Sequence, residues 1–155
     1  MTYTLEELAR EQQSLLLDRF DYDFAWRFGV LMRERAAVAV LPIAITVAHG
    51  EDVVFSALMP GATSDNFDWA KRKRAVAWRF QRSSLAMRLE AEQKQLDFNQ
   101  RYRLPEDRFT ASGGGVPLIL NGGTVIGTAA VSGLPDVEDH RLIVDAIRQM
   151  LAAVP

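Results

Sequence analysis

The chain of 155 residues has no cysteine and only two histidines. Without cysteine it has no disulfide bonds, no thiolate nucleophile and no cysteine-based zinc or iron–sulfur site. No apolar run approaches the roughly 18 residues that cross a bilayer, and the polar first residues are unlike a signal peptide. The net charge of −2 gives no general attraction to nucleic acid. We therefore expect a cytoplasmic protein with one domain over residues 1–155, and with no membrane or nucleic-acid partner.

Apolar spacing and turn residues predict the element order ααββααββα. Helices are expected over 4–18, 21–35, 64–82, 85–95 and 136–152, and strands over 37–48 (or only from Pro42), 53–58, 116–120 and 125–131. Short turns at 49–52 and 121–124 join the strands in pairs, so antiparallel pairing should dominate. The expected fold class is α/β (α+β), built either as an α/β/α sandwich around an antiparallel sheet or as two layers.

The first candidate site is the start of the helix expected over 64–82. Asp65, Asn66 and Asp68 crowd its N-terminus, where they act as simple caps or as ligand contacts. Lys73 falls on the apolar stripe of Trp69, Val76 and Phe80, so it must snorkel, pair or meet an anion. Trp69 is either a core residue or one wall of a flat-ligand pocket. Arg72 lies with Ala75 and Arg79 on a neighbouring face, and most of the basic run 71–74 is expected to be solvated.

The histidines and a glycine triplet supply the other candidates. His49 falls in an expected hairpin turn, where a solvated role is favoured. His140 begins the last helix, where it either serves as a hydrogen-bonded helix-start residue or acts as a metal or haem ligand or a proton carrier. Gly114, in the triplet before a strand, could let a ligand approach the backbone. No metal site is expected, because no second histidine or cysteine has ligand spacing.

Three segments together resemble a known family: residues 60–85, 113–120 and 124–144, which contain Asp-Asn-x-Asp-Trp, Gly-Gly-Gly-Val-Pro and Val-Ser-Gly-Leu-Pro. They are similar to the uncharacterised branch of the GlcG/HbpS-like, haem-degrading domain superfamily. The resemblance implies a profilin-like α/β/α fold with an antiparallel sheet, and assembly into a homo-oligomer. Haem is the cofactor that the resemblance implies, although no haem-ligand motif matches position by position.

Three functions therefore stay open. The first is an oligomeric protein that binds a small ligand, haem or another flat anionic molecule, through Asp65, Asn66, Asp68, Trp69, Arg72, Lys73, Gly114 and His140. The second is a scaffold or partner-binding homo-oligomer without chemistry, with the segment 65–74 at a subunit contact. The third is a small enzyme in which Asp65, Asp68 and His140 supply acid–base chemistry.

Overall fold

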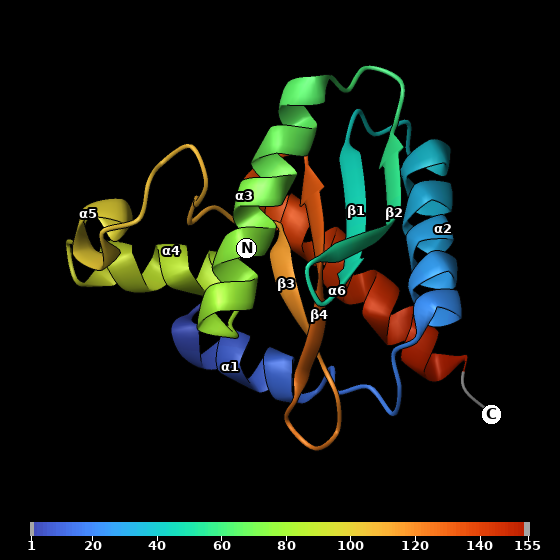
Figure 1. Cartoon of the computed structure of the whole chain (residues 1–155), viewed down its shortest axis with the longest axis horizontal. Helices are drawn as coiled ribbons and strands as arrows, with labels where there is room; N and C mark the ends of the chain where they lie inside the picture. Colours follow the sequence, from blue (N-terminus) through green and yellow to red (C-terminus); the bar gives the residue numbers. More distant parts are fainter. Residues whose placement is uncertain (1, 154–155) are drawn as a thin grey trace.

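A computed structural model describes residues 2–153 of the chain, and Figure 1 shows the course of its elements. Six helices and four strands follow in the order α1(Leu5–Gln13), α2(Tyr22–Val38), β1(Ala44–His49), β2(Asp52–Leu58), α3(Ser64–Phe80), α4(Ser84–Gln93), α5(Phe98–Tyr102), β3(Gly115–Ile119), β4(Val125–Ser132), α6(Asp136–Ala152). The order agrees with the prediction, and the five-residue helix α5 lies within residues 96–112, for which the sequence indicates irregular structure with one short helical turn.

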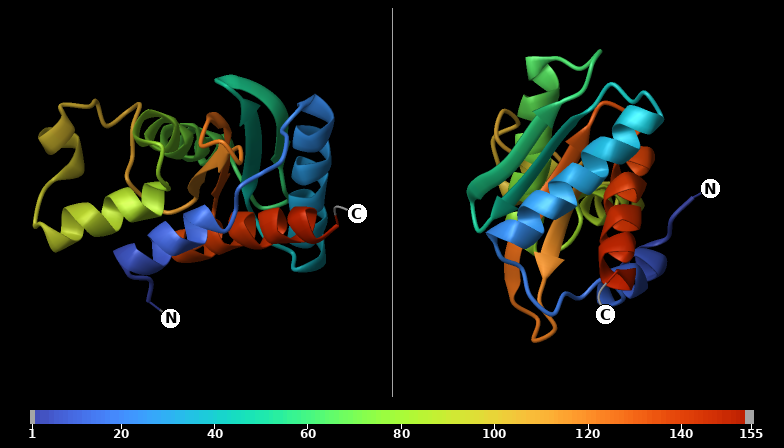
Figure 2. Two further views of the ribbon diagram at one scale, coloured as in Figure 1. Left: turned by 90° about the horizontal axis from the view of Figure 1, so that it is seen from below. Right: turned by 90° about the vertical axis from the view of Figure 1, so that its right-hand side faces the viewer.

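The four strands form one antiparallel sheet in the order β2-β1-β4-β3. The two hairpins meet where β1 pairs with β4, so the second strand of the second hairpin lies beside the first strand of the first. Figure 2 shows α3 on one side of the sheet and α2 with α6 on the other. The α/β/α sandwich is therefore confirmed, and the two-layer alternative is wrong because α3 covers the second face.

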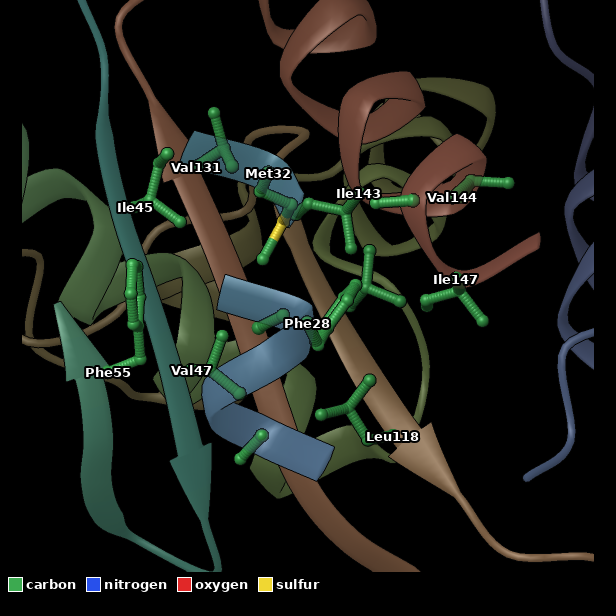
Figure 3. Close-up of a cluster of buried hydrophobic side chains, with 14 of the residues drawn as sticks. Phe28, Met32, Ile45, Val47, Phe55, Leu118, Val131, Ile143, Val144 and Ile147 are labelled. Atoms are coloured by element: carbon green, nitrogen blue, oxygen red, sulfur yellow. The ribbon is translucent and has the colours of Figure 1, made fainter. Parts of the chain in front are cut away.

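The main hydrophobic core lies between the sheet and the pair α2 and α6. Phe28 and Met32 on α2 are fully buried against the strands, and Figure 3 shows them facing Val131 of β4 and Ile143 of α6. Apolar residues at helical spacing on α2 and α6 supply one wall of this core, and alternate residues of the strands supply the other. The opposite face of the sheet carries α3, which brings the site described below against β1, β3 and β4.

The structure moves several predicted boundaries. The first helix ends at Gln13 rather than at residue 18, and α2 continues to Val38 through residues that were expected to begin a strand. Strand β1 therefore begins after Pro42, the second of the two starts considered, because proline cannot donate to the ladder. Tyr22, the first residue of α2, is 63% exposed.

Candidate functional site

Lys73 and Asp139 form a buried ion pair between α3 and the first turn of α6. Lys73 Nζ lies 3.0 Å from Asp139 Oδ2 and also donates to the Val131 carbonyl at 3.1 Å, and the two charged side chains are 3% and 1% exposed. Asp139 Oδ1 accepts from the Leu134 backbone N–H at 3.0 Å. Burial raises the pKa of Asp139 to about 6, although the Lys73 ammonium and the backbone donors act in the opposite direction. The lysine on the apolar stripe therefore pairs inside the chain and is not free for a ligand.

The glycine triplet brings backbone against this ion pair. Gly114 has φ +123°, and a Cβ added there would lie 2.4 Å from the Val131 carbonyl oxygen and 2.9 Å from Lys73 Nζ. A Cβ at Gly115 would lie 2.4 Å from the Lys73 carbonyl oxygen. The space left by the missing side chains is filled by α3 and by the pair itself. The backbone approach expected at Gly114 is thus an approach of protein to protein.

His140, the residue after Asp139 on α6, faces α1. Its Nε2 lies 2.6 Å from Glu11 Oε1, and Tyr3 donates its hydroxyl to Glu11 Oε2 at 3.0 Å. Burial acts to raise the pKa of Glu11, but the hydrogen bond and charge of His140, helped by Tyr3 and Arg148, hold that pKa below its ordinary value. The adjoining cavity is about 10 Å³, the size of one water molecule, so His140 has no room for a large cofactor.

The first turn of α6 also fixes α4. Asp136 accepts from Arg88 Nε at 2.6 Å and from the Gly113 backbone N–H at 2.8 Å. With Asp139 bound to α3 and His140 bound to α1, three side chains of one helical turn hold three other helices. Asp139 and His140 diverge by about 100° around the helix axis, and Asp136 lies one turn before His140, so the three side chains can reach separate partners. Its polar residues therefore position the fold rather than converge on one ligand.

The predicted residues at the start of α3 are spread along the surface. Asn66 Oδ1 accepts from the Thr63 backbone N–H at 2.9 Å, which makes it part of the helix cap. Asp65 accepts from Trp69 Nε1 at 3.2 Å. Trp69 is 37% exposed, and the Arg72 guanidinium lies 4.1 Å from the centre of its ring. Trp69 therefore lies at the surface and Lys73 in the interior, although the two residues are one helical turn apart.

Asp68 and Arg72 instead open onto a groove on the outer side of α3. The groove has a volume of about 780 Å³ and runs between α3 and the loop before β3. Its lining includes four cationic and three acidic residues with two aromatic rings: Lys71, Arg72, Arg79, Arg108, Glu51, Asp68, Asp107, Trp78 and Phe109. Arg72 Nε lies 3.1 Å from Asp68 Oδ2, so one of these charges is already paired.

Among the described residues, the remaining cations of the groove have no acidic partner. Within residues 2–153, no carboxylate lies within 4.0 Å of Lys71, Arg79 or Arg108. The guanidinium groups of Arg79 and Arg108 each lie 5.9 Å from the centre of the Phe109 ring. Unpaired cations around an aromatic ring suit a flat molecule that carries acidic groups.

The acid–base set considered for an enzyme is not assembled. Asp68 lines the groove, whereas His140 lines the small cavity beside α1. Asp65 and His140 each have a different partner. His49, expected in solvent, is partly buried and stacks on Phe20 at 5.8 Å. Within residues 2–153, no group of three or more histidine, aspartate or glutamate side chains could hold a metal ion.

Several residues of the groove and of the buried contacts were not selected from the sequence. Glu11 could not be assigned to His140, because 129 positions separate them. The cation–aromatic face of α3 did carry a signal: Lys71, Arg74 and Trp78 have the spacing i, i+3 and i+7 of one helical face. Phe109 and Arg108 come from an irregular loop, whose position no periodicity predicts.

The fold and site define a class: an α/β/α sandwich with buried charged pairs on one helical turn and a cationic groove on the opposite layer. Comparison with known proteins gives the family. The family described as "Haem degrading protein HbpS-like" matches residues 20–148, and the chain belongs to it. UPF0303 proteins of Streptomyces avermitilis and Rhizobium meliloti are 40% and 38% identical to it, over 96% of this chain and 91% of each relative.

Solved structures of low sequence identity share the fold. The Ybr137w protein superposes with a TM-score of 0.87 at 23% identity, over 97% of this chain and 90% of that one. A PduOC:haem complex gives 0.70 at 16% identity, covering 83% and 93%. HbpS gives 0.65 at 16% identity, covering 86% and 90%. The family match and the relatives at 40% and 38% identity confirm the resemblance noted in the sequence. Within residues 2–153, no helix is long and apolar enough to cross a membrane.

Proposed function

We propose that this protein binds a flat anionic small molecule in the groove on the outer side of α3, and that haem is the first candidate. The observation that carries the proposal is the pair of unpaired guanidinium groups, Arg79 and Arg108, at equal distances from the Phe109 ring. A volume of about 780 Å³ is in the range of small-molecule sites. The haem-degrading description of the family and the haem complex of PduOC support haem as the ligand to test first.

The residues of the groove fit the acidic edge and flat face of haem better than its iron. Arg79, Arg108 and Lys71 would hold the propionates, and Trp78 and Phe109 would contact the ring. No histidine lines the groove, since His140 faces Glu11 and His49 stacks on Phe20. Bound haem would supply redox chemistry at iron, and the protein's own part would be to hold and orient it through charge and stacking.

Haemin titration of the purified protein tests the proposal, with tryptophan fluorescence and the Soret band as readouts. The variants Arg79→Gln and Arg108→Gln should each weaken binding by about ten- to a hundredfold, because a charge-assisted contact contributes about 1.5–3 kcal/mol. Arg33→Gln is the matched control, since Arg33 is exposed on α2, on the other side of the sheet. His140→Ala should leave the affinity unchanged in protein that remains folded.

Two results would contradict this assignment. Equal affinity in wild type, Arg79→Gln and Arg108→Gln would remove the groove as the site. Loss of the Soret shift in folded His140→Ala, with both arginine variants unaffected, would move the site to the side of α1. Binding of haemin with the same affinity to Arg33→Gln as to wild type is the required control result.

We also propose that the chain forms a homo-oligomer, as the second function, a scaffold or partner-binding protein, requires. Tyr22 and Trp26, one turn apart on α2, are 63% and 56% exposed, and Val53 on the adjacent edge strand β2 is 49% exposed. Apolar side chains of this size gathered on one surface are typical of protein contacts. Light scattering after gel filtration should give a mass above that of one chain, lowered in Trp26→Glu. A monomer at all concentrations would refute assembly.

A further inference from the structure

Arg74 is a cation that the fold brings inward without giving it a counter-ion. It lies on α3 and crosses toward the sheet, where its Nη1 donates to Thr46 Oγ1 of β1 at 2.6 Å. Thr46 is 4% exposed, and Arg74 itself is half-buried. Within residues 2–153, no carboxylate lies within 4.0 Å of this guanidinium. A neutral hydroxyl satisfies one N–H, but it leaves the positive charge uncompensated.

Lys73 on the same helix is a buried cation with a structural partner, and it differs from Arg74 in this respect. Lys73, the preceding residue, has its charge matched by Asp139 at 3.0 Å. The burial of Arg74 has no such compensation, and desolvation accordingly lowers the pKa of its guanidinium. Taking an unpaired charge out of water is costly, whereas an uncharged side chain could fill the same space without that cost. The position therefore suits an anion from outside the chain.

The guanidinium lines a hollow of about 140 Å³ between α3 and the ends of β1 and β4. Lys71 is the second cation of the lining, and Thr128, which is 2% exposed, supplies a neutral polar residue from β4. Glu51 in the β1–β2 turn is the one acidic residue of the lining, so the hollow keeps a net positive charge. Its volume suits a carboxylate or phosphate group and not a flat ring system.

The structure assigns Arg74 as the oxyanion-binding residue of this hollow, with Lys71 as its second positive charge. A guanidinium has five N–H donors in a planar fork, and the bond to Thr46 uses one of them. The others can hold two oxygen atoms of one carboxylate or phosphate. The ligand class is therefore a compact oxyanion, either free in solution or carried as the acidic group of a larger molecule.

The hollow adjoins the groove and shares Lys71 and Trp78 with it. An acidic group of a ligand lying in the groove could thus reach Arg74, and in this respect the inference rests on the proposed function. The binding of a free oxyanion does not depend on it. Inorganic phosphate tests the binding of a free oxyanion. Haemin and its dimethyl ester, in which both propionates are blocked, test the binding of the acidic group of a larger ligand.

The first arm follows the Arg74 side-chain Nε–H signal by NMR while inorganic phosphate is added. The signal is assigned by its loss in Arg74→Lys. In wild type and in Arg33→Gln it should shift and saturate, and phosphate should raise the melting temperature. In Arg74→Gln the rise in melting temperature should be absent. If phosphate leaves the Arg74 signal unchanged, or moves all exposed arginine signals alike, a free-oxyanion site is refuted.

The second arm compares haemin with its dimethyl ester. Wild type should bind haemin more tightly than the ester, and Arg74→Gln should reduce this preference by about tenfold without abolishing it, because Arg79 and Arg108 would still contact the propionates. A preference for haemin that is the same in Arg74→Gln as in wild type would refute the role of Arg74. Equal affinities in wild type would refute a role of Arg74 in holding a ligand's acidic group. If phosphate binds at Arg74 but haemin does not bind at all, the inference stands and the haem proposal fails. If haemin binding depends on Arg108 while neither arm responds to Arg74, the proposed function stands and the inference fails. Should Arg74→Gln not fold, the wild-type NMR titration with phosphate decides.

Discussion

Removal of Lys73 tests whether the buried pair holds α3 to α6. In Lys73→Met the side chain keeps its length and loses its charge, so Asp139 remains buried at 1% exposure with backbone donors such as the Leu134 N–H. Breaking a buried ion pair by removing one partner costs about 3–5 kcal/mol. For a chain of this length, the melting temperature should fall by about 6–20 °C.

The loss should depend on pH. Without the ammonium, burial dominates at Asp139, and the pKa of its carboxyl rises above the wild-type value of about 6. A raised folded-state pKa means that the folded protein binds the proton more tightly than the unfolded chain does. Its stability is then greatest below the unfolded-state pKa and falls as the pH rises through the folded-state pKa. The difference between Lys73→Met and wild type should therefore be largest near about pH 8 and shrink near about pH 5, where Asp139 is protonated in both.

Urea unfolding at both pH values measures this difference, with Lys71→Met as the control. Lys71 is two positions away on the same helix, exposed and free of any carboxylate within 4.0 Å among residues 2–153. Its substitution should change the free energy of unfolding by less than about 0.5 kcal/mol. Equal stability of Lys73→Met and wild type at the higher pH, or a loss that is the same at both, would refute the reasoning.

Other changes test the surrounding contacts. Gly114→Ala should lower the free energy of unfolding by about 3 kcal/mol or more, because its backbone has φ +123° and the new Cβ would lie 2.4 Å from the Val131 carbonyl oxygen. Gly122→Ala, which has open space around it, should be near neutral. Thermal unfolding of both variants measures the difference. His140→Gln should speed hydrogen exchange in α1, since Glu11 loses its 2.6 Å partner; unchanged exchange there would show that apolar packing alone holds the helix. Because the pKa of Glu11 is lowered in the fold, its contribution to stability is present above the ordinary value of 4.5 and is lost as the pH falls through the folded-state pKa. Glu11→Gln should remove that part of the acid dependence, as followed by urea unfolding from neutral to acid pH.

The position of α1 on α6 shows why a site can depend on contacts that no local pattern contains. Leu8 of α1 packs on Leu85 of α4. Glu11, three residues after Leu8 on α1, contacts His140 of α6. The amphipathic spacing of α1 predicts that it packs somewhere. It does not predict which of five other helices receives it, because any apolar stripe offers similar burial.

The sequence by itself determined that the chain forms two hairpins joined by short turns, and the order of helices and strands around them, because these follow from spacing and turn residues within one segment. It also marked Lys73 as a cation that must snorkel, pair or meet an anion, since its place on the apolar stripe of α3 is a local property. Only the tertiary structure decided that the partner is Asp139, at a separation of 66 residues. The same holds for Arg74, which the helix directs toward the sheet but which the packing of β1 and β4 leaves without an acid. Charges that come from distant segments meet only when whole elements pack together. The proposed binding site therefore depends on the packing of α3 against the sheet and the loop before β3.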